Sequence, residues 1–375
     1  MNNNNMAEPI VDIHTRVTAD NAHGVLFHAD YPEICRLRPA PRFWLGAATP
    51  ALAHWFYTDR CAPGCGIYQL ANIKIRGIEI IEQAGQFLSI PQNGVHPQSI
   101  INALTQQPLQ DHPVTRIDEP VVFLNGPAYQ IYGHWLIDFL PRLLLLARRL
   151  HHWQRLKYLI PDDLPEFGHQ WLDLLGIPAA NIIKYQPRDH IYHLREAIIP
   201  TSLRNNGRPA PVLRFFHDFL RSTLAARAPT NPTPTASYPS RIYISRSKYG
   251  NMSRQFANAD AVEALFASHN FTIMHPETMP ITEQIALFEQ ATEIAGEYGS
   301  GLHNTIFSRP FTKVMVLRGN QGHPGFLQSG IGEIMDQPTG YVFGNTQEQA
   351  GAQITEFALD DVRTGLDVAF SGDLW

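Results

Sequence analysis

The sequence is poor in cysteine, in excess basic charge and in long apolar runs. Its 375 residues include three cysteines, Cys35, Cys61 and Cys65, an odd and sparse set that argues against a framework of disulfides. The 29 basic and 34 acidic residues give a net charge of −5, which argues against general nucleic-acid binding. No apolar run approaches the ~20 residues that a membrane-spanning helix needs. We therefore expect an ordinary globular protein without a transmembrane segment, and peripheral contact with a membrane stays open.

Targeting and metal-binding signals are also missing. The N-terminal stretch MNNNNMAEPIVDIHTR lacks the basic and apolar segments of a secretory signal, so we expect a cytoplasmic protein. CAPGC, with Cys61 and Cys65, resembles half of a zinc site, but no second cysteine pair completes it, so a turn with two partly buried thiols is favoured. The acidic pairs at 162–163 and 360–361 stand in turn or helix-start contexts and are interpreted as caps. We expect no metal site.

The chain length favours two domains. Residues 1–227 are predicted as the N-terminal domain, with short strands separated by Pro and Gly over the first ~115 residues and alternating helices and strands after them. Residues 228–240, APTNPTPTASYPS, contain four prolines and predict a Pro/Thr-rich linker, with a surface loop inside one large domain as the alternative. Residues 241–375 repeat the alternation and predict a second domain with a closing tail.

Alternation of helices and strands predicts parallel sheets covered by helices, that is, an α/β protein with a β-rich start. Such sheets bind ligands at the carboxyl ends of their strands, so we expect a cleft between two Rossmann-like domains. Helices are predicted over 134–150, 165–176, 211–227, 258–270, 280–291, 302–308 and 360–370. Strands are predicted over 156–161, 181–186, 196–202, 241–247, 271–275, 292–296 and 313–317.

A glycine-rich loop, GEYGSGLHN, follows one of these strands at residues 296–304. Its spacing is neither the dinucleotide fingerprint nor a P-loop. Glycines in this position let the backbone approach an anion, and the following helix start offers free N–H groups. A phosphate cradle and a tight structural turn both fit the pattern.

A basic loop, SRSKYGNMSR, follows the first strand of the same half and carries Arg246, Lys248 and Arg254. Because the carboxyl ends of parallel strands lie at one edge, this loop and the glycine-rich loop should lie close together. Three cations there suit a diphosphate and could stabilise it as a leaving group without a metal. A solvated basic loop is the alternative.

A polar line is predicted along the helix that contains HWLIDFLPRLLLL. His134, Asp138 and Arg142 recur at every fourth position and so lie on one helix face. An imidazole oriented by a carboxylate can deprotonate a hydroxyl group. The alternative is an ordinary Asp–Arg pair beside a histidine that caps the helix.

Three stretches, YGHWLIDFLPRLLLL, RIYISRSKYGNMSRQFAN and HPETMPITEQIALFEQATEIAGEYGSGLHNTIF, together resemble the DUF563 proteins of glycosyltransferase family 61. The resemblance covers roughly residues 120–320 and is most specific over 241–318. It implies a GT-B-like pair of Rossmann-like domains that face a cleft. It also implies an inverting, largely metal-independent transfer of a sugar from a nucleotide donor, without a cofactor. Many bacterial relatives are assigned to capsular or exopolysaccharide assembly.

On these positions, the resemblance and the residue patterns imply a complete site. The N-terminal domain would hold the acceptor, with His134 or Asp138 as the catalytic base and Arg142 in support. The C-terminal domain would bind the nucleotide-sugar, with Asn258 and Gln284 in support. The residues implied to bind the donor are Arg246, Lys248, Arg254, Glu277, Tyr298, Gly299, Ser300, Gly301, His303 and Asn304.

One position departs from the family pattern. The family commonly has histidine just before the second loop glycine, and this chain has Tyr298. Tyrosine donates a hydrogen bond but carries no positive charge at neutral pH. The departure implies altered donor choice or weaker activity, unless His303 takes the missing role.

The sequence thus predicts an inverting glycosyltransferase that moves a sugar from a nucleotide-sugar, UDP-linked in our hypothesis, to a glycan acceptor in polysaccharide biosynthesis. One alternative is a nucleotide-sugar epimerase or hydrolase on the same frame. Another is a non-catalytic carbohydrate-binding relative. The transferred sugar, the acceptor and the oligomeric state stay open.

Overall fold

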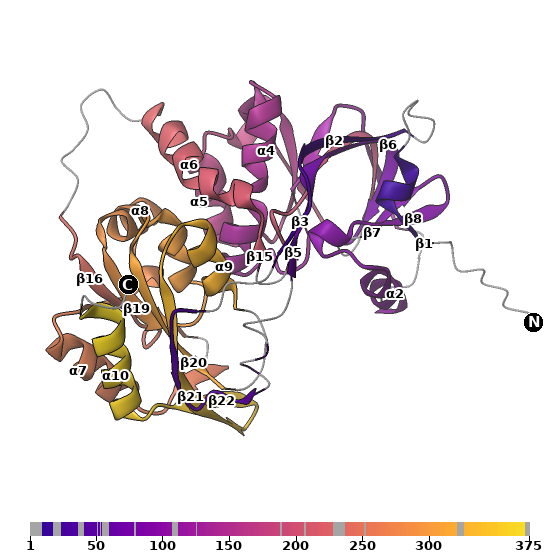
Figure 1. The fold of residues 1–375 in the computed structure, drawn as a ribbon. Helices are drawn as coiled ribbons and strands as arrows, with labels where there is room; N and C mark the ends of the chain where they lie inside the picture. The colour runs from indigo at the N-terminus through magenta and orange to yellow at the C-terminus, as the bar shows by residue number, and fades with distance from the viewer. Residues whose placement is uncertain are drawn as a thin grey trace, which may run out of the picture. The chain divides into compact units, whose positions relative to one another are not determined.

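The computed structural model describes residues 10–17, 24–36, 41–50, 52, 54, 60–78, 80–106, 112–124, 126–187, 190–205, 208–227, 237–250, 253–320 and 326–371. The chain forms two compact units (Figure 1). Unit 1 comprises Met1–Glu33, Pro63–Arg204 and Asp218–Arg227. Unit 2 comprises Ile34–Ala62, Asn205–His217 and Ala228–Trp375. Most of the predicted linker, residues 228–236, lies outside the described residues.

Unit 1 is built on a ten-stranded mixed sheet in the order β1-β8-β7-β6-β13-β10-β11-β12, with β2 on β6 and β9 on β13. Its strands are β1 (Ile10–Asp12), β2 (Val25–Tyr31), β6 (Cys65–Arg76), β7 (Ile80–Gln83), β8 (Gln86–Ser89), β9 (Val114–Ile117), β10 (Val121–Phe123), β11 (Lys157–Pro161), β12 (Ile182–Tyr185) and β13 (Ile191–Pro200). Its helices are α2 (Pro97–Gln106), α3 (Tyr132–His134), the π-helix η3 (Trp135–Phe139), α4 (Arg142–Arg149), α5 (Glu166–Leu174) and most of α6 (Phe215–Ala225). The predicted strand-rich start is confirmed.

The register of unit 1 brings two strand ends together. β10 runs parallel to β13, with Val122 paired to Ile198, and parallel to β11 on its other side. β10, β11 and β12 follow one another in chain order, whereas β13 lies on the opposite side of β10. The segments that leave β10 and β13 therefore start at the same edge of the sheet.

Unit 2 contains an eight-stranded sheet in the order β17-β22-β21-β20-β19-β16-β18, with β4 on β21. Its strands are β4 (Trp44–Gly46), β16 (Arg241–Ile244), β17 (Arg254–Phe256), β18 (Thr272–Met274), β19 (Glu293–Glu297), β20 (Lys313–Gly319), β21 (Thr339–Gln349) and β22 (Ala352–Glu356). A small pair, β3 (Ile34–Arg36) with β5 (Arg60–Ala62), also belongs to unit 2. In the pair of β14 (Arg204–Asn205) with β15 (Arg208–Pro209), Arg204 belongs to unit 1 and the other residues to unit 2. The helices of unit 2 are α7 (Ala259–Ser268), α8 (Ile281–Gln290), α9 (Leu327–Ile334) and α10 (Leu359–Phe370), with the short 3₁₀ turns η7 (Pro276–Thr278) and η8 (Leu302–Phe307).

The sheet of unit 2 alternates its side chains between two covered faces. Tyr243, Ala295 and Met315 share one apolar cluster with side chains of α7 and α10, which pack against each other (Figure 1). Ile244 and Val316, from alternate positions of the same strands, are also buried. Burial on both faces is typical of a parallel sheet and explains why these strands are continuously apolar. The predicted α/β fold is confirmed at this level, and the GT-B-like arrangement of two domains stays a prediction.

The segment 34–62 contributes to unit 2 although the sequence places it within the predicted domain 1–227. β4 pairs parallel with β21, from Tyr341↔Trp44 to Phe343↔Gly46, and so extends the sheet. Each unit is therefore assembled from several segments of the chain. Composition does not reveal where these segments begin and end, because strand pairing between distant segments leaves no compositional mark. The predicted domain roles stay predictions.

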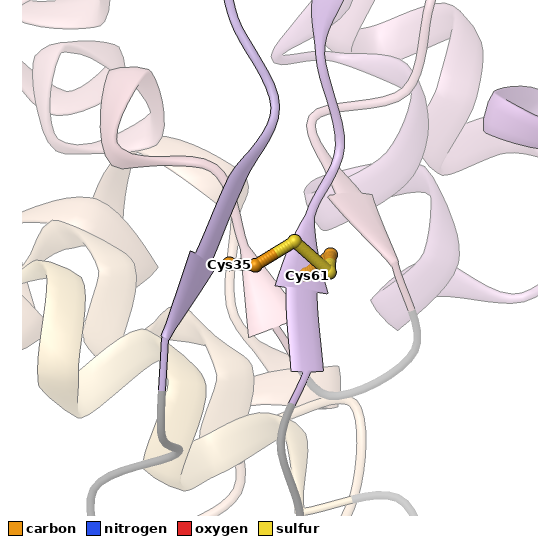
Figure 2. Close-up of a disulfide and its surroundings, with 2 residues drawn as sticks. All are labelled: Cys35 and Cys61. Carbon is orange, nitrogen blue, oxygen red and sulfur yellow. A yellow bond between two sulfur atoms is a disulfide. The ribbon is translucent and has the colours of Figure 1, made fainter.

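A disulfide joins Cys35 of β3 to Cys61 of β5 (Figure 2). The two residues are direct antiparallel partners, a register that their spacing in the sequence does not reveal. Cys65 is the remaining, buried thiol, so the predicted pair of thiols in CAPGC is wrong. Within the described residues, no helix is both long and apolar enough to cross a membrane.

Candidate functional site

A π-helix carries the first cluster of candidate residues. The Leu140 N–H donates to the carbonyl of Trp135 at 3.0 Å, five residues back, so the predicted regular helix over 134–150 is interrupted between α3 and α4. Single π turns of this kind are frequent at functional sites. The interruption still leaves His134 at the end of α3 within reach of Asp138, whose Oδ2 lies 2.7 Å from Nδ1 of the imidazole.

Arg204 completes this cluster from the segment after β13. Its Nε donates to Oδ1 of Asp138, and its Nη2 donates to Oδ2 at 2.7 Å. Arg142 contacts the backbone of the same turn. Its Nε donates to the backbone carbonyl of Asp138 at 2.5 Å, and its guanidinium lies 4.7 Å from the centre of the Phe139 ring. The shared sheet edge of β10 and β13 brings these residues together.

The charges around Asp138 fix its ionisation. Burial by itself would raise the pKa of this carboxyl, but the Arg204 charge and the hydrogen bonds from His134 and Arg204 outweigh it and hold the pKa well below its usual range. Burial, and after it the Arg204 charge, lowers the pKa of Arg142 to about 10, against the attraction of Asp138. Asp138 is therefore a carboxylate and a poor proton acceptor at neutral pH.

His134 is the better-placed proton acceptor of the cluster. A carboxylate only accepts hydrogen bonds, so Nδ1 of His134 must carry the proton that Asp138 binds. In the neutral imidazole this leaves a lone pair on Nε2. The side chain of His134 is 39% exposed, against 12% for Asp138, so a substrate hydroxyl group can reach the imidazole. The arrangement suits general-base chemistry at Nε2.

The second cluster lies at the switch point of the unit 2 sheet. The parallel strands β16, β18, β19, β20 and β21 are arranged in the order 2-1-3-4-5, in which the direction of winding reverses between β16 and β19. In open α/β sheets, ligands bind outside the carboxyl ends of the strands at this reversal. The predicted basic loop leaves β16 and the predicted glycine-rich loop leaves β19, so both lie where a ligand is expected.

Gly299 and Arg246 form the closest contact between these two loops. A Cβ atom on residue 299 would lie 2.5 Å from Nη1 of Arg246, whereas one on Gly301 would meet nothing closer than 3.4 Å. Gly299 thus lets the Arg246 guanidinium lie directly on the loop backbone. Among the described residues, Nε of Arg246 has no hydrogen-bond acceptor although it is buried. This group is well prepared to bind an anion.

Two glutamate side chains, the buried Glu297 and the half-buried Glu263, hold the basic loop in place. The Arg246 N–H donates to Oε1 of Glu297 at 3.0 Å, and the Ser245 hydroxyl donates to Oε1 of Glu263 at 2.5 Å. Burial raises the pKa of Glu297 to about 7, and repulsion from Glu263 and Glu277 adds to the effect against the hydrogen bond and charge of Arg246. The loop is therefore preorganised before any ligand binds.

Two more guanidinium groups gather at the same edge. Arg318, next to the end of β20, lies 4.8 Å from the ring centre of Tyr298 and 4.7 Å from that of Phe326. Desolvation, followed by repulsion from Arg246 and Arg318, lowers the pKa of Arg254, which places all three charges in one neighbourhood. Positive charge at the strand ends suits a diphosphate. Tyr298 here has a clear physical role, as one of the rings that hold Arg318.

Several predicted donor-binding residues lie inside the fold. Asn304 is fully buried and donates to Oε1 of Gln284 at 2.8 Å, and His303 lies 3.2 Å from Oε1 of Gln328. The Asn258 side chain bonds both backbone groups of Phe357, at 2.8 and 3.2 Å, and makes no capping bond to α7. These contacts support the loops from the interior of unit 2. A direct role of Asn258, His303 and Asn304 at the donor site stays a prediction.

The remaining predicted positions are at the surface or in the loop itself. Lys248 is exposed, Ser300 is half-buried, and Glu277 lies 3.9 Å from Nδ1 of His275. The predicted helix over 302–308 is a six-residue 3₁₀ turn, η8, whose first N–H groups donate to the carbonyls of residues 299–301. The cations, rather than a helix dipole, are therefore the main attraction for an anion.

The acidic pair at 162–163 is not a helix cap as predicted. Asp163 accepts hydrogen bonds from the Tyr129 hydroxyl and, at 2.8 Å, from Nε2 of Gln130, so it anchors the segment that leads to His134. Among the described residues, the grouping with metal-ligand spacing is Glu33 with Cys35 and Cys61, and the disulfide occupies both sulfur atoms. The expectation of a metal-free site stays a prediction.

Three residues of these clusters, Arg204, Glu297 and Arg318, are not among the predicted site residues. For Glu297 and Arg318 the available signal is a charged residue at the carboxyl end of an apolar strand. Glu297 is the last residue of β19 and Arg318 the last but one of β20, whereas Arg204 begins β14, the strand after β13. Strand ends are difficult to locate from sequence, and these charges therefore did not stand out from ordinary surface residues.

Residues 132–315 match the family model described as Glycosyltransferase 61. This stretch of the chain, just under half of its length, is similar to the glycosyltransferase 61 family. A glycosyltransferase activity follows from this match, and with it a sugar donor and an acceptor. The match contains His134, Asp138 and Arg246, and it ends just before Arg318. No protein with a curated description matches the chain. The predicted resemblance is confirmed for this family, and its capsular type stays a prediction.

Proposed function

We propose that the protein is an inverting glycosyltransferase that transfers a sugar from UDP to a glycan acceptor in polysaccharide biosynthesis. One observation carries the proposal: the charges of Arg246, Arg254 and Arg318 lie near one another at the ligand edge of the unit 2 sheet, inside or just beyond the family match. A nucleoside diphosphate presents two phosphates to such a site, and charge-assisted hydrogen bonds from arginine suit both.

The chemical step needs one base and a stabilised leaving group. The acceptor oxygen forms a bond to the anomeric carbon while the bond from that carbon to the phosphate oxygen breaks, and UDP leaves with the electron pair. The hydroxyl proton passes to Nε2 of His134, with Asp138 orienting the imidazole and stabilising its charge. Displacement from the opposite side inverts the anomeric centre. The proposal rests on the predicted GT-B-like fold, which stays a prediction.

The arginine cluster supports a reaction without a divalent cation. Arg246 and Arg254 would stabilise the charge that develops on the departing diphosphate. We expect turnover of a UDP-sugar with a glycan acceptor to be unchanged by EDTA. If EDTA abolishes turnover and Mg²⁺ restores it, the metal-free mechanism is wrong while the transferase remains.

A decisive test of the proposed donor measures thermal stabilisation by UDP, GDP, CMP and their sugars, followed by turnover with an acceptor panel. We expect the largest shift with UDP compounds and a product of inverted configuration in NMR spectra. Release of UDP or an altered donor at full rate without acceptor would favour the hydrolase or epimerase instead. Binding without turnover on any acceptor would favour the non-catalytic relative, and no binding of any nucleotide would refute the donor site.

A further inference from the structure

Tyr249 stands out in the basic loop because it is a large aromatic side chain at the surface. The residue is 48% exposed, although its neighbour Arg246 is half-buried. It is not among the predicted site residues. A single exposed aromatic residue is ordinary by itself, so its surroundings must decide whether it has a function.

The surroundings hold Tyr249 beside the anion site. Its N–H donates to the carbonyl of Arg246 at 2.8 Å, which closes a tight turn at the carboxyl end of β16. The Arg246 guanidinium lies 5.2 Å from the centre of the Tyr249 ring. The same guanidinium also lies against the glycine-rich loop, because a Cβ atom on Gly299 would be only 2.5 Å from its Nη1. Ring, guanidinium and glycine-rich loop thus follow one another in space.

Hydrogen bonds hold the start of the loop that carries the ring. Glu297 binds the Arg246 N–H, and Ser245 is bonded to Glu263 and Ser247. An aromatic ring on such a loop loses little conformational freedom when a ligand stacks on it. Stacking of a base on an aromatic ring contributes about 1–3 kcal/mol and tolerates different bases, because every base presents a π face.

We propose that Tyr249 is the stacking platform for the nucleobase of the donor. This rests on the proposed function, because it requires a nucleoside diphosphate at Arg246. With the diphosphate on Arg246 and the Gly299 loop, the ribose separates it from the base, and the exposed ring beside the same guanidinium is the planar surface the base meets. The contact distinguishes a nucleotide from a bare diphosphate, which needs only the arginines.

The test uses calorimetric titration of the full-length protein with UDP, GDP and inorganic pyrophosphate. In Tyr249→Ala, we expect the affinity for UDP and GDP to fall about tenfold and the affinity for pyrophosphate to stay unchanged. Tyr249→Phe should keep nucleotide affinity, since stacking needs the ring and not the hydroxyl group. Phe311→Ala is the matched control, because Phe311 is an exposed aromatic residue, at 80%, that belongs to neither cluster.

The outcomes separate the two proposals. Unchanged nucleotide affinity in Tyr249→Ala, with nucleotide binding intact in the wild type, overturns the stacking role alone. An equal loss for pyrophosphate also overturns it, because the ring would then act by holding Arg246. A wild type that binds pyrophosphate but no nucleotide, or neither, overturns the proposed donor and the stacking platform together.

Discussion

At the scale of single residues, the glycines of the loop 296–304 have different jobs. Gly296 lies in β19 against Ile244, where a Cβ atom would come within 2.7 Å of the isoleucine side chain, so it serves strand packing. Gly299 instead makes room for the Arg246 guanidinium. Gly296 therefore has a structural role in the sheet, whereas Gly299 is the glycine that lets the loop contact the charged side chain of Arg246.

Gly299→Ala is expected to weaken nucleotide binding about tenfold while the protein stays folded. The new methyl group displaces the flexible end of Arg246, which costs little stability but removes a charge-assisted contact of about 1.5–3 kcal/mol. Gly301→Ala is the control, since a Cβ atom there makes only ordinary contacts. Calorimetric titration with UDP measures both variants, and equal affinities in the two would contradict the role assigned to Gly299.

Glu297 should make the stability of the protein depend on pH near neutrality. Its pKa is about 7 in the folded state because of burial, whereas an unfolded glutamate titrates at about 4.3. Between these values the folded state holds the extra proton, so stability falls as pH rises, by about 4 kcal/mol in all. Glu297→Gln, which still accepts from the Arg246 N–H, should remove this dependence. Thermal unfolding at pH 5 and pH 8 gives the comparison, and a pH dependence that the variant retains would refute the assignment.

At the scale of elements, the pairing of β3 with β5 joins the two ends of the segment that contains β4, and β4 itself pairs with β21 of the large sheet. The disulfide joins residues separated by 26 positions, and a closed loop of this length stabilises the folded state by about 3 kcal/mol. Disulfides persist mainly in oxidising compartments. The cytoplasmic location expected from the N-terminus therefore stays a prediction, and this bond is the feature that speaks against a reducing environment.

The double variant Cys35→Ser/Cys61→Ser is expected to unfold at a lower temperature than the wild type by an amount that matches the effect of reductant. The wild type should lose stability when dithiothreitol is added, because the loop constraint on the unfolded chain is lost. The double variant should not respond to dithiothreitol, although Cys65 remains in it. Equal melting temperatures of the wild type with and without reductant would show that the bond does not stabilise the fold.

At the scale of the whole molecule, each unit has one cluster at the carboxyl ends of its strands. The cluster of His134, Asp138 and Arg204 suits proton transfer, and the cluster of Arg246, Arg254 and Arg318 suits a diphosphate. If these roles are divided between the units, then catalysis and donor affinity should respond to different substitutions.

His134→Gln is expected to lower kcat by about 10²–10⁴, the usual contribution of a general base, while the Kd for UDP stays unchanged. Arg246→Ala should raise the Kd for UDP at least about tenfold, because a charge-assisted contact is lost. Kinetics with a UDP-sugar and calorimetry with UDP provide the two readouts. A change in UDP affinity in His134→Gln as large as in Arg246→Ala would argue against the division of roles.

The sequence by itself determined the local features of this protein. Apolar strands, glycine-punctuated loops and the spacing of His134 and Asp138 depend on neighbours along the chain, and these predicted the α/β fold, the ligand loops and the family. Only the tertiary structure decided which distant residues meet. The pairing of β10 with β13 brought Arg204 to Asp138, the register of β3 with β5 joined Cys35 to Cys61, and the order of strands set Arg318 beside Tyr298. These contacts depend on strand pairing over long sequence separations, for which a single sequence has no local signature.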